Sequence, residues 1–585
     1  MAAETSTGTP GVLTWIARRG FAETLACALA FLVYVPTLGF EFVYDDKPQV
    51  IRNPAIHAWR FLPRYFTSHA WAELDPHVLG NYYRPLFLLW FRLNHAVFGL
   101  NPPGWHLSTV LCHVAVTYLV FALIRRLAKS AWIAFFSATL FAVHPVHLES
   151  VAWVSGVTDP LMAVFLIAAF LAYLRFREEG HAKWMGAALG WFCLALLAKE
   201  TAVVLGVLVF LYAWLYSETR AWASRFATAL RHSLAFFALT LLYLAVRARV
   251  LHGLSHTVTP LSMRTMALTE PSVVWLYVRH LLFPVGLSGL YGLPYVQSAR
   301  SAAFAVPMAA LLLVSLALAW GLRRLEDSRL GLFAFGWLVL PILPALWLRT
   351  YAEGDIAHDR YLYVPSVGFI LLLALFGAEI ARRWPARDKQ IQLAALVGFT
   401  LAYGAGAFAQ QTFWASDLLL YTRAYRIAPQ DNLISNDLGT ELMEAGDPRG
   451  AMTLYLQVLA RKPDYWLANY NLGYAYYKTG KFRDAEAFLR HAISINAADS
   501  DEFMYLGLSV WRQGRVDEAA QWVERAIGIR PTGQGYHYVL GMIRRDQNDL
   551  PAARSEFNLE LENYPGTSPA RQQLDLLDGA APGPK

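Results

Sequence analysis

Long apolar blocks fill the first two thirds of this 585-residue chain, between about Ala22 and Gln411. Most of them are close to the ~20 residues that an α-helix needs to cross a bilayer. After Gln411 the composition becomes that of a soluble helical protein. We therefore predict an all-α chain that begins with a polytopic membrane bundle of about eleven spans. The predicted spans are 22–40, 105–124, 131–143, 160–176, 184–198, 201–217, 233–250, 302–322, 330–349, 361–381 and 391–411.

Composition supports the membrane assignment. Hydrophobic residues make up 56% of the chain and charged residues 16%, against about 25% charged in soluble domains. The net charge of +7 comes from short basic clusters between apolar blocks, which is typical of cytoplasmic loops rather than of a nucleic-acid site. The three cysteines, Cys27, Cys112 and Cys193, all lie in apolar blocks, so we expect neither a disulfide framework nor thiol catalysis.

The basic clusters also predict the topology. They share one face if the N-terminus is cytoplasmic and the first apolar block is an uncleaved helix. The stretch 273–291 is apolar as well, but counting it as a crossing would move Arg323, Arg324 and the cluster at 382–389 outside. We therefore expect it to be re-entrant or interfacial. The connections then predicted on the outer face are 41–104, 144–159, 251–301 and 351–360.

A repeat of 34 residues fills the soluble part. Leu-Gly pairs begin at Leu438, Leu472, Leu506 and Leu540, and an alanine follows each leucine after 13 residues. This pattern is typical of tetratricopeptide repeats, which stack pairs of helices into an α-solenoid with a concave groove for peptides or proteins. We predict four repeats over 431–567, a connecting helix or partial repeat over 412–430, and a C-terminal tail over 568–585 whose end, after Gly579, is disordered.

Polar residues gather in the predicted outer connections. Asp45 and Asp46 follow the first span, and the second connection begins with the sequence His144-Pro145-Val146-His147-Leu148-Glu149. Ionisable groups at membrane depth are costly and are commonly functional. A carboxylate there could act as a base or hold a divalent cation. The structural alternative, solvated helix ends and interfacial polar residues, has about equal weight for these two connections.

Six more charged residues have the same predicted location: Arg84, Asp159, Lys199, Glu200 and the pair Asp359-Arg360. The structural alternatives are an ion pair between Lys199 and Glu200, and snorkelling of the two arginines to headgroups. Each residue alone is a weak signal. The predicted topology nevertheless brings all these groups to one face, which incidental structural charges would not require.

Five short motifs contain most of these residues: Tyr44-Asp45-Asp46, Tyr83-Arg84-Pro85-Leu86, the stretch from His144 to Val154, Ala198-Lys199-Glu200-Thr201 and the stretch from Arg360 to Ser366. They resemble motifs of the C-type glycosyltransferase superfamily, and the closer resemblance is to the transmembrane and tetratricopeptide-repeat protein O-mannosyltransferases. The resemblance spans most of the chain and includes the order of its parts. The array of four repeats is shorter than is usual in animal members, and the Ala-, Arg- and Trp-rich composition indicates a bacterial relative.

The resemblance implies that residues 1–411 form a glycosyltransferase that moves a hexose, expected to be mannose, from a polyprenyl-phosphate donor to Ser or Thr hydroxyls of proteins. Asp45 or Asp46 would then be the base. The implied donor-phosphate and substrate-binding residues are Arg84, His144, His147, Glu149, Asp159, Lys199, Glu200, Asp359 and Arg360. A divalent cation is left open, with Asp46, His147 and Glu149 as candidate ligands.

Eleven crossings would place the repeats on the outer face, where they could hold the acceptor. That face is the periplasm for a bacterial inner membrane, or the lumen for a membrane of the endoplasmic reticulum. Two alternatives remain open from the sequence: an enzyme that glycosylates a lipid or a cell-wall glycan, and a non-enzymatic scaffold whose repeats recruit partner proteins.

Overall fold

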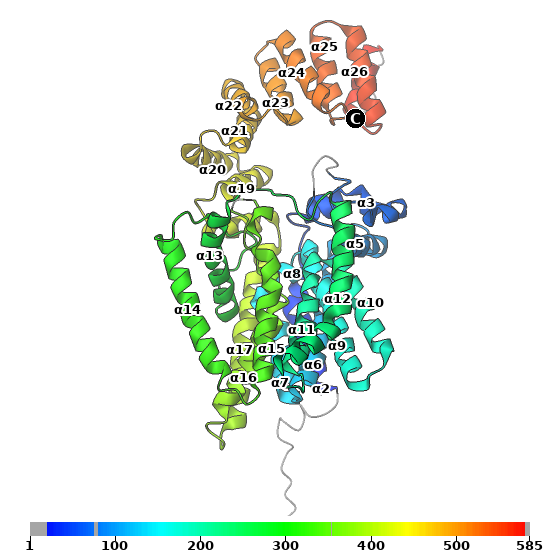
Figure 1. Cartoon of the computed structure of the whole chain (residues 1–585). Coiled ribbons are helices and arrows are strands. Elements are labelled where there is room, and N and C mark those ends of the chain that lie inside the picture. The colour runs from blue at the N-terminus through cyan, green and yellow to red at the C-terminus, as the bar shows by residue number, and fades with distance from the viewer. Residues whose placement is uncertain (1–19, 75–79, 353, 579–585) are drawn as a thin grey trace, which may run out of the picture. The chain divides into compact units, whose positions relative to one another are not determined.

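The computed structural model describes residues 20–74, 80–352 and 354–578 (Figure 1). In these residues the regular secondary structure is helical, and the one β-type pairing is an isolated bridge between Leu293 and Gly354. The chain divides into two compact units, residues 1–427 and 428–585. The predicted fold class, a membrane helical bundle followed by an α-solenoid, is confirmed.

Every predicted span coincides with a helix. In the described chain, seven helical segments are long and apolar enough to cross a membrane. The number is eight if the pair 131–143 and 145–151, which is bent by 52°, forms one broken span. The other three predicted spans are apolar helices of 10–17 residues. The span helices are α2 (Phe21–Tyr34), α6 (Pro102–Ala128), α7 (Ala131–Val143), α9 (Thr158–Glu179), α10 (Ala182–Ala198), α11 (Leu205–Leu215), α12 (Trp222–Val250), α14 (Ala302–Leu322), α15 (Ser328–Val339), α16 (Pro365–Ala381) and α17 (Asp388–Gln410).

Helices outside the predicted spans build one end of the bundle. They include α3 (Pro54–His57), α4 (Leu62–Tyr65), α5 (Pro85–Phe98), α8 (Leu148–Val151) and α13 (Met263–Leu282). Figure 1 shows α3 and α5 at that end. α13 covers part of the stretch 273–291 and is not among the segments that are long and apolar enough to cross. The remainder, 283–291, is irregular.

A capping side chain begins one helix of the bundle, and a glycine lets two of its helices pack closely. Ser130 caps α7 by accepting the N–H of Ile133 at 3.3 Å, as hydroxyl residues do at helix N-termini. At Gly368 of α16, a Cβ atom would lie 2.4 Å from the carbonyl oxygen of Ala334 in α15. Only glycine lets the two backbones pack this closely.

The opposite end of the bundle carries the predicted basic clusters. There Arg126, in the last turn of α6, pairs with Glu178 of α9. Arg382, after α16, pairs with Glu326, before α15. These contacts join helix ends and connections that the predicted topology puts on one face. The basic clusters therefore lie at one end of the bundle, and the polar residues of the predicted outer connections lie at the other.

The second unit is the predicted solenoid. Its helix pairs are α19 (Asn432–Glu444) with α20 (Pro448–Arg461), α21 (Trp466–Lys478) with α22 (Phe482–Ile495), α23 (Ser500–Trp511) with α24 (Val516–Ile529), and α25 (Tyr536–Asp546) with α26 (Leu550–Asn563). A Cβ atom at the glycine of each Leu-Gly pair would lie 2.5–2.7 Å from the side chain 16 residues later. The repeat glycines therefore permit the close packing of each pair, as the spacing predicts.

Two helices lie in the segments predicted to connect or to follow the repeats. Helix α18 (Asp417–Ile427) lies within the predicted connecting helix or partial repeat over 412–430, and it belongs to the membrane unit. Residues 568–577, expected in the tail, form α27 (Ser568–Leu577), whose Ala570 packs with Ala553 and Phe557 of α26. An apolar face on this last helix was the missed signal. The predicted disorder after Gly579 lies outside the described residues.

Candidate functional site

A small polar cavity of about 60 Å³ brings three predicted outer connections together. Its wall combines one carboxylate and two guanidinium groups with aromatic rings, an arrangement suited to a polar ligand that carries negative charge. The lining residues are Asp45, Gln49, Ala70, Trp71, Tyr82, Arg84, Phe87, Trp153, Ser155, Thr158, Arg360 and Tyr361. Segments more than 300 residues apart in the sequence therefore meet at one site.

Asp45 is held in the cavity wall by an unusual backbone. The preceding Tyr44 has φ 54°, in the left-handed region that a bulky side chain rarely adopts. Its N–H donates to Asp417 of α18 at 2.6 Å. A π-helical turn over Lys47–Ile51 follows, and it carries Gln49 back towards Asp45. Strained backbone of this kind is commonly retained at functional sites.

Burial raises the pKa of Asp45 to about 6, although the Arg360 guanidinium opposes this shift. A carboxylate with this pKa is largely ionised at pH 7 and accepts a proton more readily than an ordinary aspartate. Its position in the cavity wall leaves it open to a ligand.

Asp46 has a different environment, although it is the next residue. Its side chain is fully buried and accepts three hydrogen bonds: from the N–H of Ser155 at 2.8 Å, the hydroxyl of Ser155 at 2.5 Å and the N–H of Val43 at 3.3 Å. Burial raises the pKa of Asp46 to about 7, against the effect of these bonds. Asp46 therefore ties the first connection to the second, and it does not line the cavity.

The sequence-adjacent pair Lys199 and Glu200 forms two separate ion pairs. Glu200 accepts hydrogen bonds from Nε and Nη2 of Arg84, at 3.0 and 2.6 Å. Lys199 Nζ donates to both oxygens of Asp159 at 2.7 Å, and both of these side chains are almost wholly buried. The simple alternative, an ion pair between Lys199 and Glu200, is therefore not what the structure shows. Each residue instead joins a different segment of the chain.

Arg360 is fixed against Glu149. Its backbone N–H donates to one carboxylate oxygen of Glu149 at 3.0 Å, and its guanidinium donates to the other. The guanidinium carbon also lies 5.4 Å from the ring centre of Trp153. Burial works to lower the pKa of Arg360, but the charge of Glu149 prevails and raises it well above its ordinary value. Arg360 is therefore a fixed cation in the cavity wall.

Asp359 lies behind Arg360 in a buried network that sequence reasoning missed. His280 Nδ1, from α13, lies 2.7 Å from one oxygen of Asp359, and the hydroxyl of Tyr291 donates to the other. All three side chains are at most 5% exposed. Both partners come from the connection 251–301, and no local motif there predicts that they pair with Asp359. The pairing becomes visible only when α13 packs against the segment before α16.

The two histidines of the second connection face elsewhere. His144 accepts the N–H of Val146 and donates to the carbonyl of Leu281, each at 3.2 Å. His147 Nε2 lies 2.9 Å from the hydroxyl of Ser366. Both rings are fully buried, and neither lines the polar cavity.

The three candidate metal ligands are likewise separated by their contacts, since Asp46 bonds Ser155, His147 lies against Ser366 and Glu149 pairs with Arg360. In the described parts of the chain, no group of three or more His, Cys, Asp or Glu side chains is arranged to hold a metal ion.

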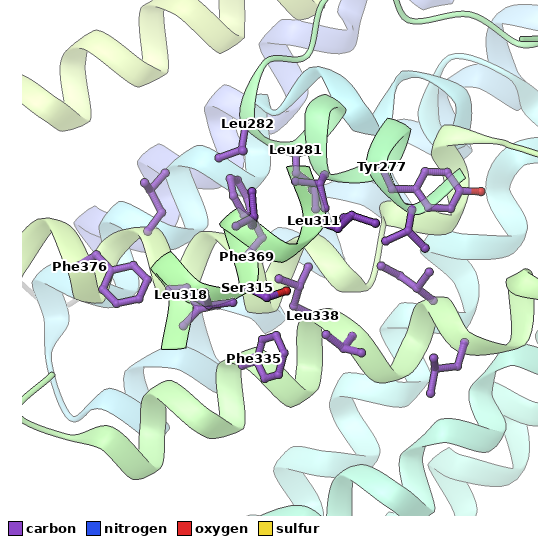
Figure 2. Close-up of a pocket in the computed structure, with 18 of the residues that line it drawn as sticks. Tyr277, Leu281, Leu282, Leu311, Ser315, Leu318, Phe335, Leu338, Phe369 and Phe376 are labelled. Atoms are coloured by element: carbon purple, nitrogen blue, oxygen red, sulfur yellow. The ribbon is translucent and has the colours of Figure 1, made fainter. Parts of the chain in front are cut away.

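An apolar cavity of about 400 Å³ lies between α13, α14, α15 and α16 (Figure 2). Figure 2 shows Tyr277 at one end of its wall and Phe376 at the other. The hydroxyl of Tyr277 accepts the N–H of His358, two residues before Arg360. The wall of the apolar cavity is therefore connected by one hydrogen bond to the segment that carries a cation of the polar cavity.

Family models match segments of both units of the chain. Residues 83–246 match the family model of dolichyl-phosphate-mannose-protein mannosyltransferases, and residues 442–503 and 502–534 match tetratricopeptide-repeat models. Among solved structures, the crystal structure of MamA is 23% identical, covers 27% of this chain and 90% of its own, and has a TM-score of 0.24.

The similar curated proteins include Protein O-mannosyl-transferase TMTC3 of Mus musculus, which is 25% identical over 92% of this chain and 63% of its own length. Protein O-mannosyl-transferase Tmtc2 of Drosophila melanogaster is 38% identical over 31% of this chain and 20% of its own. The chain thus spans less than two thirds of the length of these relatives. The comparisons confirm its resemblance to the transmembrane and tetratricopeptide-repeat O-mannosyltransferases.

Proposed function

We propose that the membrane unit transfers a hexose from a polyprenyl-phosphate donor to a Ser or Thr hydroxyl of a protein. The observation that carries this proposal is the polar cavity, in which the Asp45 carboxylate shares one wall with the guanidinium groups of Arg84 and Arg360. A base and two fixed cations are what transfer from a phosphate-linked sugar needs. The mannosyltransferase names of the relatives make mannose the expected sugar.

The reaction is a displacement at the anomeric carbon of the sugar, with an oxocarbenium-like transition state as in glycoside hydrolysis. The acceptor oxygen forms a bond to that carbon while the bond from the carbon to the phosphate oxygen breaks. Asp45 takes the hydroxyl proton, and the phosphate leaves with both electrons of the broken bond. Arg84 and Arg360 stabilise the charge that develops on the phosphate.

The partners of these cations hold them in position. Glu200 orients Arg84, and Glu149 orients Arg360. The Lys199–Asp159 pair lies just behind, with Lys199 Nζ 5.0 Å from the ring centre of Tyr361 in the cavity wall. We assign His144 and His147 a packing role, because their contacts lie outside the cavity.

The apolar cavity provides a place for the donor's hydrocarbon chain. Its lining is almost entirely Leu, Val, Ile and Phe, and its wall reaches the Arg360 segment through Tyr277. A lipid there would keep its phosphate near Arg360 while the tail lies among apolar side chains. Side chains of α13 between residues 274 and 282, within the stretch expected to be re-entrant or interfacial, contribute to this lining.

The repeats are proposed to bind the acceptor polypeptide, as solenoids of this type present a concave groove. The predicted crossings would put them on the same outer face as Asp45 and Arg360. For a bacterial chain this face is the periplasm.

Transfer of mannose by the purified full chain in lipid nanodiscs tests the proposal. Polyprenyl-phosphate mannose is the donor, and a peptide containing Ser and Thr is the acceptor. We expect mannosylated peptide from the wild type and from Glu326→Gln, a matched change of an exposed acid far from the cavity, but not from Asp45→Asn. Transfer to a lipid or glycan but not to the peptide would favour the glycan alternative. No transfer to any acceptor, with full binding of partners by the repeats, would favour the scaffold.

A further inference from the structure

A second polar cavity, of about 220 Å³, lies where the last span meets α18. It is lined by side chains from the end of α17 and from one face of α18, and no carboxylate occurs among the described residues of its wall. The lining residues are Ala409, Gln410, Thr412, Phe413, Leu419, Thr422, Arg423 and Arg426. The cavity therefore carries two positive charges with no opposite charge in its lining.

Arg423 is built into this cavity. Its Nε donates to the carbonyl of Leu287 at 2.9 Å, and its Nη2 lies 3.4 Å from Gln410 Oε1. Its guanidinium carbon is 5.8 Å from the ring centre of Phe413. These contacts use two of the five N–H groups of a guanidinium and leave the others for a ligand.

Arg426 lies three residues further along α18, so the two side chains are neighbours on one helix face. It is exposed, and the structure gives it no hydrogen bond or ion pair with any residue it describes. A pair of arginines, one fixed and one free, matches the charge and the geometry of a phosphate group.

The surroundings indicate where that phosphate comes from. The candidate span of this segment ends at Trp414, so the cavity lies at the level of lipid headgroups. Below it, Leu401 and Phe408 of α17 are 66% and 58% exposed, and Leu419 at its rim is 47% exposed. Acyl chains could cover this apolar surface, whereas a free phosphate ion would gain nothing from it.

We propose that this cavity binds the phosphate headgroup of an anionic membrane phospholipid, with the acyl chains lying along α17. The site is separate from the Asp45 cavity and does not depend on the proposed transferase activity. It would fix α18 to the membrane surface, and with it the segment that holds Tyr44 through Asp417.

Native mass spectrometry of the delipidated full chain, titrated with phosphatidylglycerol, tests this site. A single basic residue near a membrane surface contributes roughly a fivefold change in binding, so Arg426→Gln should weaken lipid binding about fivefold. Arg300→Gln is the matched control, because Arg300 is exposed just before another span, α14. The double variant Arg423→Gln/Arg426→Gln should weaken binding further, and the single exposed variant keeps the test valid if the double variant does not fold.

Two further probes separate the possible sources of the phosphate. Phosphatidylcholine should bind less tightly than phosphatidylglycerol, because its positively charged choline group neutralises the negative charge of its phosphate. Inorganic phosphate should not displace the lipid at the same concentration. Equal lipid binding by Arg426→Gln and Arg300→Gln would overturn the proposal. Displacement of phosphatidylglycerol by equimolar inorganic phosphate would also overturn it, in favour of a simple anion site.

Discussion

The adjacent residues Asp45 and Asp46 should respond in opposite ways to the same substitution. Asp45 lines the polar cavity, whereas Asp46 is buried and satisfies three hydrogen-bond donors. Changing either to Asn conserves size and removes the charge. If the assignment of roles is right, Asp45→Asn removes activity and Asp46→Asn removes stability.

The magnitudes follow from these contacts. Loss of a general base lowers a rate by about 10²–10⁴-fold, so Asp45→Asn should reduce transfer at least about a hundredfold. An Asn at 46 can keep its oxygen towards Ser155, but its amide group then faces the N–H of Val43. One buried donor is left without an acceptor, which costs about 1–3 kcal/mol. This corresponds to a fall in Tm of about 2–4 °C per kcal/mol.

The assay pairs initial rates of mannose transfer with thermal unfolding of the same purified samples. Asp45→Asn should unfold at or above the wild-type temperature, because burial of the ionised carboxylate costs stability and Asn removes that cost. Asp46→Asn should retain its rate within about tenfold at a temperature where it is folded. The reasoning is refuted if Asp45→Asn transfers mannose at the wild-type rate. It is refuted equally if Asp46→Asn loses its activity with an unchanged Tm.

Three further outcomes are expected. The rate of transfer should rise with pH and level off above about pH 6, because Asp45 accepts a proton only when ionised and its pKa is raised to about 6. A transfer rate that does not change between about pH 4.5 and pH 7 would contradict this prediction. Lys199→Met should destabilise the chain by about 3–5 kcal/mol because it leaves Asp159 buried without its partner, and the double variant Lys199→Met/Asp159→Leu should recover most of the loss in thermal unfolding. Gly507→Val should increase hydrogen exchange in α23 and α24, since a Cβ there would lie 2.7 Å from Val523, whereas a matched change at the open Gly528 should not.

The sequence predicted the elements of the fold better than their contacts. Spans and repeats are periodic, so each signal is present in one short segment, and all eleven predicted spans coincide with helices. The Leu-Gly pairs likewise mark where two helices must approach closely. The sequence did not show which unit α18 joins or that α27 forms. Both are amphipathic helices at the ends of units, where tertiary packing decides which unit a helix joins.

The candidate site was predictable as a set of residues but not as an arrangement. Asp45 and Asp46 are equivalent in the sequence, and the left-handed backbone of Tyr44 and the hydrogen bonds from Ser155 make them different. Arg84 and Glu200 are 116 residues apart, so their pairing depends on how the helices pack. Gln49 lies in the cavity only because a π-turn follows Asp46.

The ion pairs around the polar cavity are poor candidates for simple stabilising contacts. Taking two charges out of water costs several kcal/mol for each ion, and apolar residues of similar volume commonly replace a buried pair without loss of stability. Yet Arg84–Glu200, Lys199–Asp159 and Arg360–Glu149 all occur around one small cavity. Each pair joins segments distant in the sequence, and two of the three cations line the cavity. A bundle that needed only stability would have apolar residues here, so the cost of these charges favours a role in binding an anionic ligand, as the transfer of a phosphate-linked sugar requires.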